Sequence, residues 1–496
     1  MYPKQLSFQE IQNHFETIDQ LLLSSVLSLG GIVSGVTIDS RAVRPGFAFI
    51  AVKGHAQDGH NFIEAALKLG SVLIICEHPQ ERSVPHMCVS SSRLAWAYLE
   101  DLRYGHPGSK LKVIGVTGTN GKSSSVWMIC HLLNTLGQKT AMIGTLGSKL
   151  AGSLEPTNHT TPDPDQLFKL LRDAVSSGAK CVAMEVSSQA LAHGKVSPLR
   201  FAGAVFTSFS RDHLDFHPSM EDYFEAKWAL FSLVLPGGFK LMHQDIVHTA
   251  PVNKQRIDSA NMEFYGLSSS LSSSLYGFTY TLNTLTFHTK DVTLKASTPY
   301  LGSLANTNLV ASIMAVSHVS GSPMSEIMSH VSSLPQVPGR FEFVGKSKSG
   351  GLVYTDYAHT PDAIQKAALA IKDAYPGMKL RILFGCGGDR DKGKRPLMGS
   401  AAAKECETVY LTSDNPRSEE PKQIIEDIYK GCLEVSLGAE IILEVDREEA
   451  IRKAVSSLNS LSILIIAGKG HETYQIIKDK KLPFDDREVA KKYLNP

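Results

Sequence analysis

Residues 111–123, Leu-Lys-Val-Ile-Gly-Val-Thr-Gly-Thr-Asn-Gly-Lys-Ser, constrain the fold of this chain more than any other stretch. The first six are mostly apolar and partly β-branched, which predicts a buried strand over 111–116. A turn of small residues follows, and residues 124–136 then place Met128, Leu132 and Leu136 on one stripe of a predicted helix. A strand, a glycine-rich turn and a helix in this order form the arrangement that cradles phosphates. The sequence therefore predicts a nucleotide-binding loop.

This predicted loop carries the side chains that nucleotide chemistry needs. Glycines allow backbone N–H groups to approach phosphates, and the helix N-terminus adds partial positive charge. Lys122 can reach the terminal phosphates, and the Ser123 hydroxyl can hold Mg²⁺. The strict Walker A spacing requires glycine at position 116, where this chain has Val116. The alternative to a nucleotide-binding loop is an ordinary tight strand-to-helix turn in which Lys122 is exposed to solvent.

Length and composition narrow the class of protein. A chain of 496 residues predicts two to four domains, and 43% apolar with 20% charged residues is typical of a folded soluble protein. The net charge of +1, without a basic block, argues against electrostatic binding of nucleic acid. Seven cysteines without a CxxC pair argue against a zinc or disulfide framework and favour a reducing compartment. We expect no signal peptide and no membrane span, and hence a cytoplasmic location.

Residues 1–107 predict a small α/β domain. Apolar runs at 47–52 and 72–76 are expected to be strands, with a helix over 62–69 between them, which makes one βαβ unit. Polar stretches at 37–41 and 54–59 border this unit and could be ordinary turns. The sequence Tyr-Gly-His-Pro-Gly-Ser at 104–109 predicts a linker.

Residues 108–336 predict a central domain that contains the nucleotide loop. Further strands are expected at 140–143, 181–186 and 202–206, and helical stretches between them indicate a mostly parallel sheet with sites at the carboxyl ends of its strands. Glu185 at such an end is well placed for Mg²⁺. His213 is a candidate second metal ligand or phosphate contact, and by itself it would be interpreted as a structural histidine. Segments 276–280 and 284–289 predict a hairpin without assigned chemistry.

Residues 337–496 predict a Rossmann-like sheet. Strands are expected at 353–356, 380–384, 408–412, 440–443 and 463–467. No GxGxxG fingerprint is present, so no dinucleotide is implied. Polar, charged loops follow four of these strands, at 356–361, 385–392, 414–417 and 468–472. Four such loops on one edge of a sheet predict a site for a ligand that carries both charges.

Taken together, these motifs resemble the Mur ligase family, the ATP-dependent amide-forming enzymes of peptidoglycan synthesis. The nearest branch adds meso-diaminopimelate to UDP-MurNAc-L-Ala-D-Glu. The resemblance runs nearly from end to end, and the segments that carry it are 39–41, 118–123, 185–188, 211–215, 227–228, 338–340, 356–359, 385–396, 414–417 and 468–472.

The resemblance implies an α/β fold of three domains. Residues 1–107 would bind the UDP-MurNAc peptide, 108–336 would form the ATP-binding P-loop domain with a mostly parallel sheet, and 337–496 would form a Rossmann-like domain for the incoming amino acid. The implied reaction turns the D-Glu γ-carboxylate into an acyl phosphate, which the amine of the amino acid then attacks. ATP as co-substrate, two Mg²⁺ ions and a CO₂-derived carbamate on Lys227 are implied. We expect a monomer.

The resemblance also implies roles for individual residues. Catalytic roles fall to Lys122, His213, Lys227 and Arg340, and metal ligands are Ser123, Glu185, His213 and the Lys227 carbamate. The implied ATP contacts are Gly118, Thr119, Asn120, Gly121, Lys122, Ser123, Ser124, Asn308, Arg340 and Asp356. The implied contacts to UDP-MurNAc-dipeptide are Ile38, Ser40, His55, Ala56, Gln57, His159, Thr160, Thr161, Ser187, His193 and Lys195. The implied contacts to diaminopimelate are Arg390, Asp414, Asn415, Pro416, Arg417, Gly468 and Glu472.

Three positions depart from the family pattern. His159 stands where relatives have the Asn of Asn-Thr-Thr, and His193-Gly194-Lys195 stands where they have Gln-x-Arg. Lys195 keeps the positive charge of arginine but not its planar fork. Near Asn308, the usual Phe-Asn appears as Leu-Ala at 304–305.

Several alternatives remain open from the sequence. Residue physics alone would place Lys227 on a helix surface, and Asp-Asn-Pro-Arg at 414–417 could be an ordinary turn. The same ligase could use L-lysine, or the chain could resemble folylpolyglutamate synthetase, which shares the Gly-Thr-Asn-Gly-Lys loop. From another class, it could be a nucleotide-gated binding module without ligase activity. Glu185, His213 and Lys227 argue against that module, and the predicted uridine-nucleotide domain argues against folate.

Overall fold

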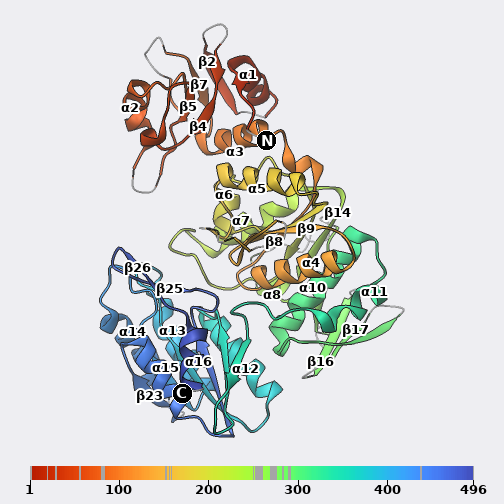
Figure 1. The fold of residues 1–496 in the computed structure, drawn as a ribbon, viewed down its shortest axis with the longest axis vertical. Helices are drawn as coiled ribbons and strands as arrows, with labels where there is room; N and C mark the ends of the chain where they lie inside the picture. The colour runs from red at the N-terminus through yellow and green to blue at the C-terminus, as the bar shows by residue number, and fades with distance from the viewer. Residues whose placement is uncertain are drawn as a thin grey trace. The chain divides into compact units, whose positions relative to one another are not determined.

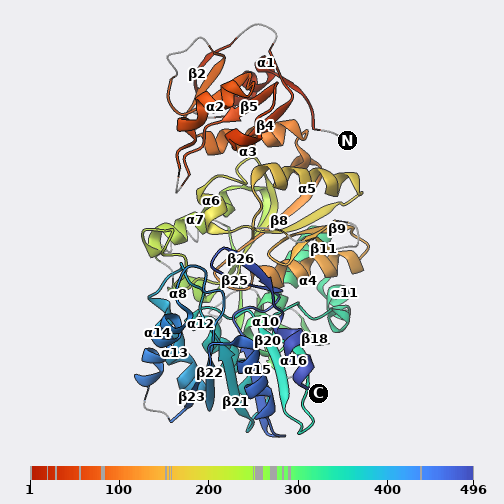
Figure 2. The ribbon, with the colours of Figure 1, turned by 60° about the vertical axis from the view of Figure 1, so that its left-hand side comes forward.

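Helices alternate with strands through much of the described part of the chain, as predicted for an α/β protein (Figure 1 and, turned by 60°, Figure 2). The computed structural model describes residues 3–18, 21–27, 31–54, 57–79, 84–150, 154–155, 157, 159–249, 251, 261–267, 276–281, 284–288, 292–435 and 438–494. Within these ranges, no helix is long and apolar enough to cross a membrane.

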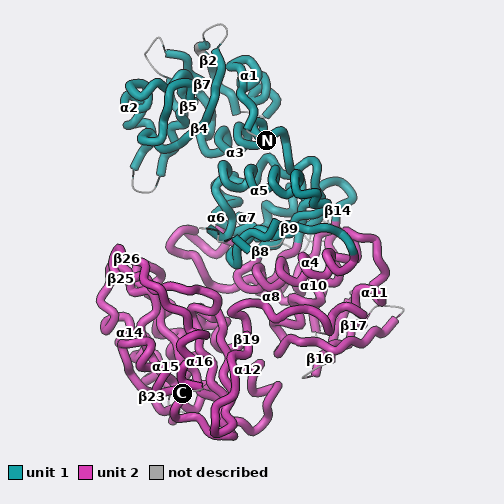
Figure 3. Tube along the Cα trace, viewed as in Figure 1, with its two compact units in different colours: residues 1–117, 137–204, 226–238 teal, residues 118–136, 205–225, 239–496 magenta. Residues whose placement is uncertain are grey.

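The chain forms two compact units that are interleaved in sequence (Figure 3). The first unit comprises residues 1–117, 137–204 and 226–238, and the second comprises 118–136, 205–225 and 239–496. Three elements cross a boundary between these ranges: β13 (Phe201–Phe206), α7 (Met220–Ser232) and β14 (Val234–His243). The division into three domains stays a prediction.

The N-terminal part of the first unit is a five-stranded sheet in the order β2-β7-β6-β5-β4. The predicted βαβ unit is confirmed, because β5 and β6 are parallel and α2 connects them. Apolar side chains cover both faces, with α1 and α3 on one and α2 on the other. The elements are β1 (Leu6–Ser7), α1 (Phe8–Glu16), β2 (Leu22–Val26), β3 (Ile32–Val33), β4 (Gly35–Thr37), η1 (Ser40–Ala42), β5 (Phe47–Ile50), η2 (Gly59–Phe62), α2 (Ile63–Lys68), β6 (Leu73–Cys76), β7 (His86–Val89) and α3 (Ser92–Arg103).

The rest of the first unit contains the strands predicted around the nucleotide loop. β9 and β8 both pair in parallel with β12, so the ends of these strands lie at one edge. That edge carries Thr145 after β9 and Glu185 at the end of β12. The elements are η3 (Pro107–Lys110), β8 (Lys112–Thr117), β9 (Thr140–Gly144), β10 (Gly147–Lys149), β11 (Leu154–Glu155), α5 (Pro164–Ser176), β12 (Cys181–Glu185) and α6 (Ser188–Ala192).

The second unit begins with the helix that follows the nucleotide loop. This helix, α4 (Lys122–Thr135), packs against α10 (Gly302–Ser320), and both bury most of their surface. β16 and β17 form the predicted antiparallel hairpin. The other elements of this part are α8 (Asp245–Thr249), β15 (Glu263–Leu267), β16 (Tyr276–Thr281), β17 (Thr284–His288), β18 (Thr293–Ser297), α11 (Met324–Ser329) and η5 (Val331–Ser333).

The C-terminal part of the second unit is a six-stranded sheet in the order β19-β20-β24-β21-β22-β23. All five predicted strands are confirmed and pair in parallel, whereas β19, which was not predicted, is antiparallel. The elements are β19 (Glu342–Lys346), β20 (Leu352–Asp356), α12 (Pro361–Ala374), β21 (Lys379–Phe384), α13 (Lys394–Glu405), β22 (Thr408–Leu411), α14 (Pro421–Leu433), β23 (Glu440–Leu443), α15 (Arg447–Ser456), β24 (Ser462–Ala467), β25 (Tyr474–Ile477), β26 (Lys480–Pro483) and α16 (Asp486–Leu494).

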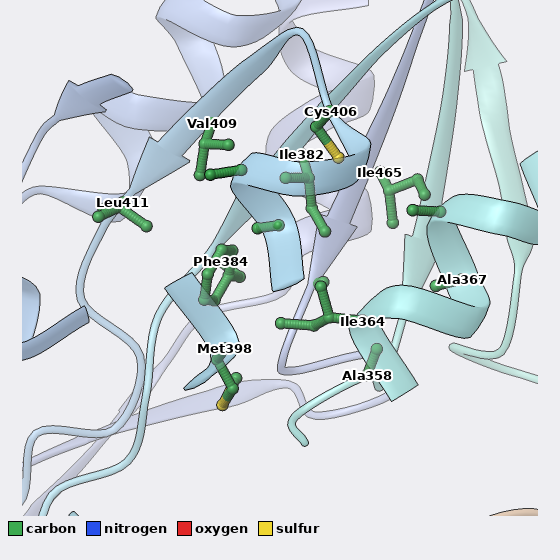
Figure 4. Packing of buried hydrophobic residues seen from close by; sticks show 14 of the residues in the cluster. Ala358, Ile364, Ala367, Ile382, Phe384, Met398, Cys406, Val409, Leu411 and Ile465 are labelled. Atoms are coloured by element: carbon green, nitrogen blue, oxygen red, sulfur yellow. The ribbon is translucent and has the colours of Figure 1, made fainter. Parts of the chain in front are cut away.

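Two apolar clusters hold helices to this sheet. On one face, Ile382 and Phe384 of β21 pack with Ile364 of α12 and Met398 of α13 (Figure 4). On the other face, α15 and α16 bury their apolar residues against the same strands. Because β20, β24, β21 and β22 are parallel neighbours, the four polar loops that follow them lie along one edge, as predicted.

A buried ion pair ties two of these loops to the C-terminal helix. Arg447 Nε and Nη2 donate to the Asp486 carboxylate at 2.8 and 2.7 Å, and both side chains are 0% exposed. The same guanidinium donates to the carbonyl oxygens of Ala467 at 2.9 Å and Ser413 at 3.3 Å, where β24 ends and just beyond β22.

We expect Arg447→Met to lower the free energy of unfolding by about 3–5 kcal/mol, because it leaves the Asp486 charge buried without its partner. Chemical denaturation followed by circular dichroism measures this. Arg452→Met in the same helix is the matched control, since Arg452 pairs with Glu449 at an exposed site and should change stability little. Equal losses in the two variants would contradict this assignment.

Candidate functional site

The loop between β8 and α4 requires its glycines for conformation and for space. Gly118 has φ +147° and Gly121, which caps α4, has φ +90°. A Cβ atom on Gly118 would lie 2.1 Å from Thr207 Oγ1, and one on Gly121 would lie 2.4 Å from Asn308 Oδ1. The loop therefore has the tight backbone that brings N–H groups close to a bound phosphate.

Residues after β13 hold this loop in place. Thr119 N–H donates to Ser208 O at 2.9 Å, and Asn120 N–H donates to Ser208 Oγ at 2.8 Å. Lys122 Nζ donates to the carbonyl oxygens of Gly118 at 2.8 Å and Thr119 at 2.9 Å. The lysine thus lies over its own loop, which argues against the solvent-exposed alternative.

Two side chains beside the loop each have a buried hydrogen-bonding atom without a partner among the described residues. Asn308 is 2% exposed, and its Oδ1 has no partner among the described residues. Arg340 Nη2 donates to Ser123 Oγ at 3.3 Å, its guanidinium lies 4.4 Å from the centre of the Tyr357 ring, and its buried Nε has no partner in the described part of the chain. Because buried polar atoms are normally paired, these atoms fit a site that is completed by a ligand.

Asp356 lies at the end of β20, next to the segment that carries Arg340. Its carboxylate accepts Phe341 N–H at 2.9 Å and Ala358 N–H at 2.8 Å. Burial raises the pKa of Asp356, while Arg340 and these backbone N–H groups oppose the rise. The observed role of Asp356 is to fix the backbone beside Arg340, and its predicted contact to ATP stays a prediction.

The loop that carries His213 is organised by Asp212. His213 has φ +54°, and its N–H donates to Asp212 Oδ1 at 3.0 Å. Its Nε2 lies 3.5 Å from Asp212 Oδ2. Burial raises the pKa of Asp212, but His213, His359 and Lys394 lower it more, to about 2. The anionic Asp212, which received no role from the sequence, therefore orients His213.

In the first unit, the ends of β9 and β12 gather four predicted residues. Glu185 is 1% exposed, and its carboxylate accepts Thr145 N–H at 2.7 Å and Thr145 Oγ1 at 3.2 Å. Thr145 Oγ1 in turn donates to Thr160 Oγ1 at 3.0 Å. Thr161 Oγ1 donates to Glu185 O and accepts Ser187 N–H, both at 3.0 Å. Thr160, Thr161, Glu185 and Ser187 therefore lie together in the structure.

Two residues that depart from the family pattern meet at one carboxylate. Lys195 Nζ lies 2.6 Å from Asp163 Oδ1, and His159 Nε2 lies 3.8 Å from Asp163 Oδ2. Asp163 was not predicted as a site residue. His193 follows α6 as its C-terminal capping residue.

Lys227 on α7 is buried at 1% exposure, so the interpretation as a helix-surface lysine is wrong. A signal for this was present in the sequence. Positions three and four residues away on either side, which share its helix face, are apolar and buried: Tyr223, Phe224, Leu230 and Phe231.

The predicted uridine-nucleotide residues are surface residues where they are described. Ile38 is 37% exposed, Ser40 begins η1, and Gln57 is exposed. His55 and Ala56 lie outside the described residues. The described residues contain no group of three or more His, Cys, Asp or Glu side chains close enough together to hold a metal ion.

Three predicted amino-acid contacts lie together around Lys469, and we call them the acceptor cluster: Asp414, Asn415 and Glu472. Asn415 Nδ2 donates to Glu472 Oε2 at 2.9 Å. Gly468 has φ +103°, and a Cβ atom there would lie 2.8 Å from Asp414 Oδ2. The loops after β22 and β24 therefore meet, as predicted from their position at one sheet edge.

Arg417 is held by a hairpin that the sequence did not predict. It has φ +52°, its N–H donates to Ile476 O at 3.1 Å, and its carbonyl accepts Lys478 N–H at 2.8 Å. Its Nη1 donates to Gly388 O at 2.7 Å. The fixed backbone of Arg417 argues against an ordinary exposed turn.

Two other predicted amino-acid contacts lie near this loop or in it. Pro416 lies beside Gly388, where a Cβ atom would be 1.9 Å from Pro416 O. Arg390 is exposed.

The sequence missed Lys469 as a site residue, although it lies inside a predicted motif. Its side chain is 0% exposed, and its Nζ lies 3.2 Å from Glu472 Oε2 and 3.3 Å from Asn415 Oδ1. Burial of a lysine could not be inferred from a loop without periodicity.

Comparison with known proteins matches three segments of the chain to Mur ligase models. Residues 32–97 match the Mur ligase family catalytic domain, 116–316 the Mur ligase middle domain, and 339–470 the Mur ligase glutamate ligase domain.

Full-length relatives give the same result. A UDP-N-acetylmuramoyl-L-alanyl-D-glutamate–2,6-diaminopimelate ligase from Geobacillus thermodenitrificans is 38% identical over 92% of this chain and 94% of its own length. The ligase of the same name from Aquifex aeolicus is 38% identical over 93% and 94%. A solved structure of a ligase with this name matches 99% of both chains with a TM-score of 0.67 and 30% identity. The chain therefore belongs to the Mur ligase family.

Proposed function

We propose that this protein is an ATP-dependent ligase that adds meso-diaminopimelate to UDP-MurNAc-L-Ala-D-Glu in peptidoglycan precursor synthesis. The observation that carries the proposal is similarity over nine-tenths of the chain to ligases named for these substrates. The fixed Arg417 and the acceptor cluster, in the same chain as a nucleotide loop, support it.

The chemistry explains why such a chain needs ATP. A carboxylate is a poor electrophile, and its conversion to an acyl phosphate supplies a leaving group. The amine of the incoming amino acid attacks the acyl carbon, and the tetrahedral intermediate collapses to an amide and phosphate, with ADP as the other product. The carboxylate and ATP, which react in the first step, are both anions, so their charges must be neutralised. Water must also be kept away from the acyl phosphate.

For ATP, the proposed contacts are the loop from Gly118 to Ser124 with Asn308, Arg340 and Asp356. Lys122 supplies the point charge for the transferring phosphoryl group. The unpaired Arg340 Nε and Asn308 Oδ1 are the atoms that a nucleotide would satisfy. Arg340 already contacts Ser123, so its charge is available close to the loop.

For Mg²⁺, the proposed ligands are Ser123, Glu185, His213 and a carbamate on Lys227. Hard oxygen donors suit this ion, and Mg²⁺ typically binds through one or two carboxylates together with substrate phosphates. A buried carboxylate at Glu185 and a buried lysine at position 227 fit such a role. When bound, the ion would neutralise phosphate charge and polarise the phosphoryl oxygens.

For UDP-MurNAc-dipeptide, the proposed contacts are Ile38, Ser40, His55, Ala56, Gln57, His159, Thr160, Thr161, Ser187, His193 and Lys195. Lys195 and His159 both contact the Asp163 carboxylate, so their positions are coupled in this chain.

We propose that the protein is a monomer and that it works in the cytoplasm.

The choice of amino acid is proposed to depend on Arg417. Its guanidinium suits a bidentate pair with the distal carboxylate of diaminopimelate, which L-lysine lacks. Arg390 is a second candidate cation, and Asp414, Asn415 and Glu472 would accept from the distal ammonium. Lysine would leave Arg417 desolvated and unpaired at a cost on the order of 1–3 kcal/mol.

We expect Arg417→Ala to raise the KM for diaminopimelate by about 10- to 100-fold and to narrow the preference over L-lysine. Steady-state phosphate release with each amino acid measures both. Arg452→Ala, at an exposed pair on α15, is the control. A wild-type protein that used L-lysine equally well would contradict the specificity claim while leaving the ligase assignment intact.

One assay separates the proposal from its rivals. Purified protein is given ATP, Mg²⁺ and UDP-MurNAc-L-Ala-D-Glu, and phosphate release is recorded with diaminopimelate, with L-lysine or with neither. Release that needs both UDP-substrate and diaminopimelate supports the proposal. Release with L-lysine would support the lysine ligase, release only with a folate and glutamate would support the folylpolyglutamate rival, and no release would favour a binding module.

A further inference from the structure

Lys469 places a fully buried ammonium group inside the amino-acid site. Its Nζ lies 3.2 Å from Glu472 Oε2, 3.3 Å from Asn415 Oδ1 and 3.6 Å from Asp414 Oδ1. These are the three members of the acceptor cluster, and they come from two loops. A lysine with 0% exposure is rare, because removing its charge from water is costly unless it is paired.

The contacts of Lys469 orient the acceptor cluster. Asn415 Oδ1 accepts from Lys469 and from Ile476 N–H at 2.9 Å, which turns Asn415 Nδ2 toward Glu472. Asp414 Oδ1 is buried and has no hydrogen-bond partner among the described residues. The cluster therefore keeps an unfilled acceptor while its other atoms are fixed.

We propose that Lys469 is a positioning residue of the amino-acid site, which sets the geometry and the charge of the acceptor cluster so that it accepts the ammonium of the incoming amino acid. This inference rests on the proposed ligase function. The cluster with Lys469 holds two carboxylates and one cation, so a ligand ammonium makes it neutral. Without Lys469, two carboxylates would remain in one buried site, and a proton would compete with the ligand.

The groups around Glu472 support this assignment. Burial raises the pKa of Glu472, Lys469 opposes the rise, and Asp414 adds to it. The other charged or titratable groups facing it are Arg447, Tyr357 and Tyr474. Arg447 is committed to Asp486, and burial raises the pKa of both tyrosines, which keeps them neutral. Lys469 is thus the cation that opposes protonation of the cluster.

The test is the KM for meso-diaminopimelate and kcat of Lys469→Met, measured by phosphate release from about pH 6 to about pH 9.5. Near neutral pH, we expect KM to rise about 10- to 100-fold with kcat nearly unchanged at saturation. Without the cation, the pKa of Glu472 rises further. The KM of the variant should therefore fall as the pH increases, and it should level off at a higher pH than the KM of the wild type. Lys481→Met is the matched control, because Lys481 is an exposed lysine of β26 whose Nζ lies 3.8 Å from the centre of the Tyr474 ring.

Other outcomes of this experiment would overturn the positioning role of Lys469 or the proposed function. A KM that is unchanged, or raised by the same factor at every pH, would overturn the proposal. If circular dichroism shows that Lys469→Met does not fold, Lys469→Arg replaces it. The retained charge should leave the pH dependence of KM as in the wild type, while the bulkier group raises KM. A shifted pH dependence of KM in Lys469→Arg would overturn the proposal. A wild-type protein without diaminopimelate-dependent phosphate release would overturn the proposed function itself.

Discussion

Lys122→Ala should lower kcat by about 10³-fold or more while leaving the fold intact. In the proposed function Lys122 supplies the point charge for the transferring phosphoryl group, and no other lysine lies in the loop. In the structure its Nζ donates to two carbonyl oxygens of its own loop, those of Gly118 and Thr119. The glycines and the contacts to Ser208 determine the loop backbone, so truncation of the side chain should not unfold it.

The measurement is phosphate release under saturating substrates, with circular dichroism and thermal unfolding as checks of the fold. Lys180→Ala, an exposed lysine before β12, is the matched control and should retain wild-type turnover. If folded Lys122→Ala released phosphate at a near-normal rate, the assignment of the nucleotide loop would be wrong.

Lys227→Ala should be nearly inactive, and short-chain carboxylates such as acetate should restore part of the activity. Lys227 is 1% exposed, so its terminal group lies away from solvent. Reaction with CO₂ would replace the Lys227 ammonium with an anionic carbamate that can bind Mg²⁺ through oxygen. A small carboxylate could occupy the space left by the truncated side chain and supply the missing oxygens.

Activity of Lys227→Ala at several acetate concentrations tests this, with chloride at equal ionic strength as the salt control. Lys240→Ala, on β14, is a control for loss of a lysine elsewhere. Full activity of the wild type after removal of CO₂, together with an unmodified Lys227, would contradict the carbamate.

The parallel strands β20, β21, β22 and β24 were predictable because they are mostly buried and have apolar runs in the sequence. β23 was predicted with its observed bounds, and β20, β21 and β24 to within one residue at their ends. β19 and the hairpin β25–β26 were missed, because edge strands with mixed polar residues lack that signal. Missing the hairpin in the prediction affected the candidate site, because β25 and the residue after it hold the backbone of Arg417.

The candidate site was predictable wherever a residue follows a strand. Glu185 and Ser187 lie at the end of β12 and directly after it, whereas Thr161 reaches them from the loop before α5. Lys469 and Asp163 were missed because their roles depend on contacts between loops, which no local spacing encodes. Residue physics alone would misplace Lys227 on the helix surface, because it weighs one charged residue without the apolar residues on the same helix face.

The most direct test of the account uses UDP-MurNAc-L-Ala-D-Glu with ¹⁸O in both oxygens of the γ-carboxylate. Wild-type protein, ATP, Mg²⁺ and meso-diaminopimelate are added, and both products are analysed by mass spectrometry. An acyl-phosphate ligase passes one labelled oxygen to phosphate and keeps the other in the new amide. We expect UDP-MurNAc-tripeptide carrying one ¹⁸O at this amide, and phosphate carrying one ¹⁸O. Unlabelled phosphate, or a UDP-MurNAc-dipeptide that stays unextended, would contradict the account.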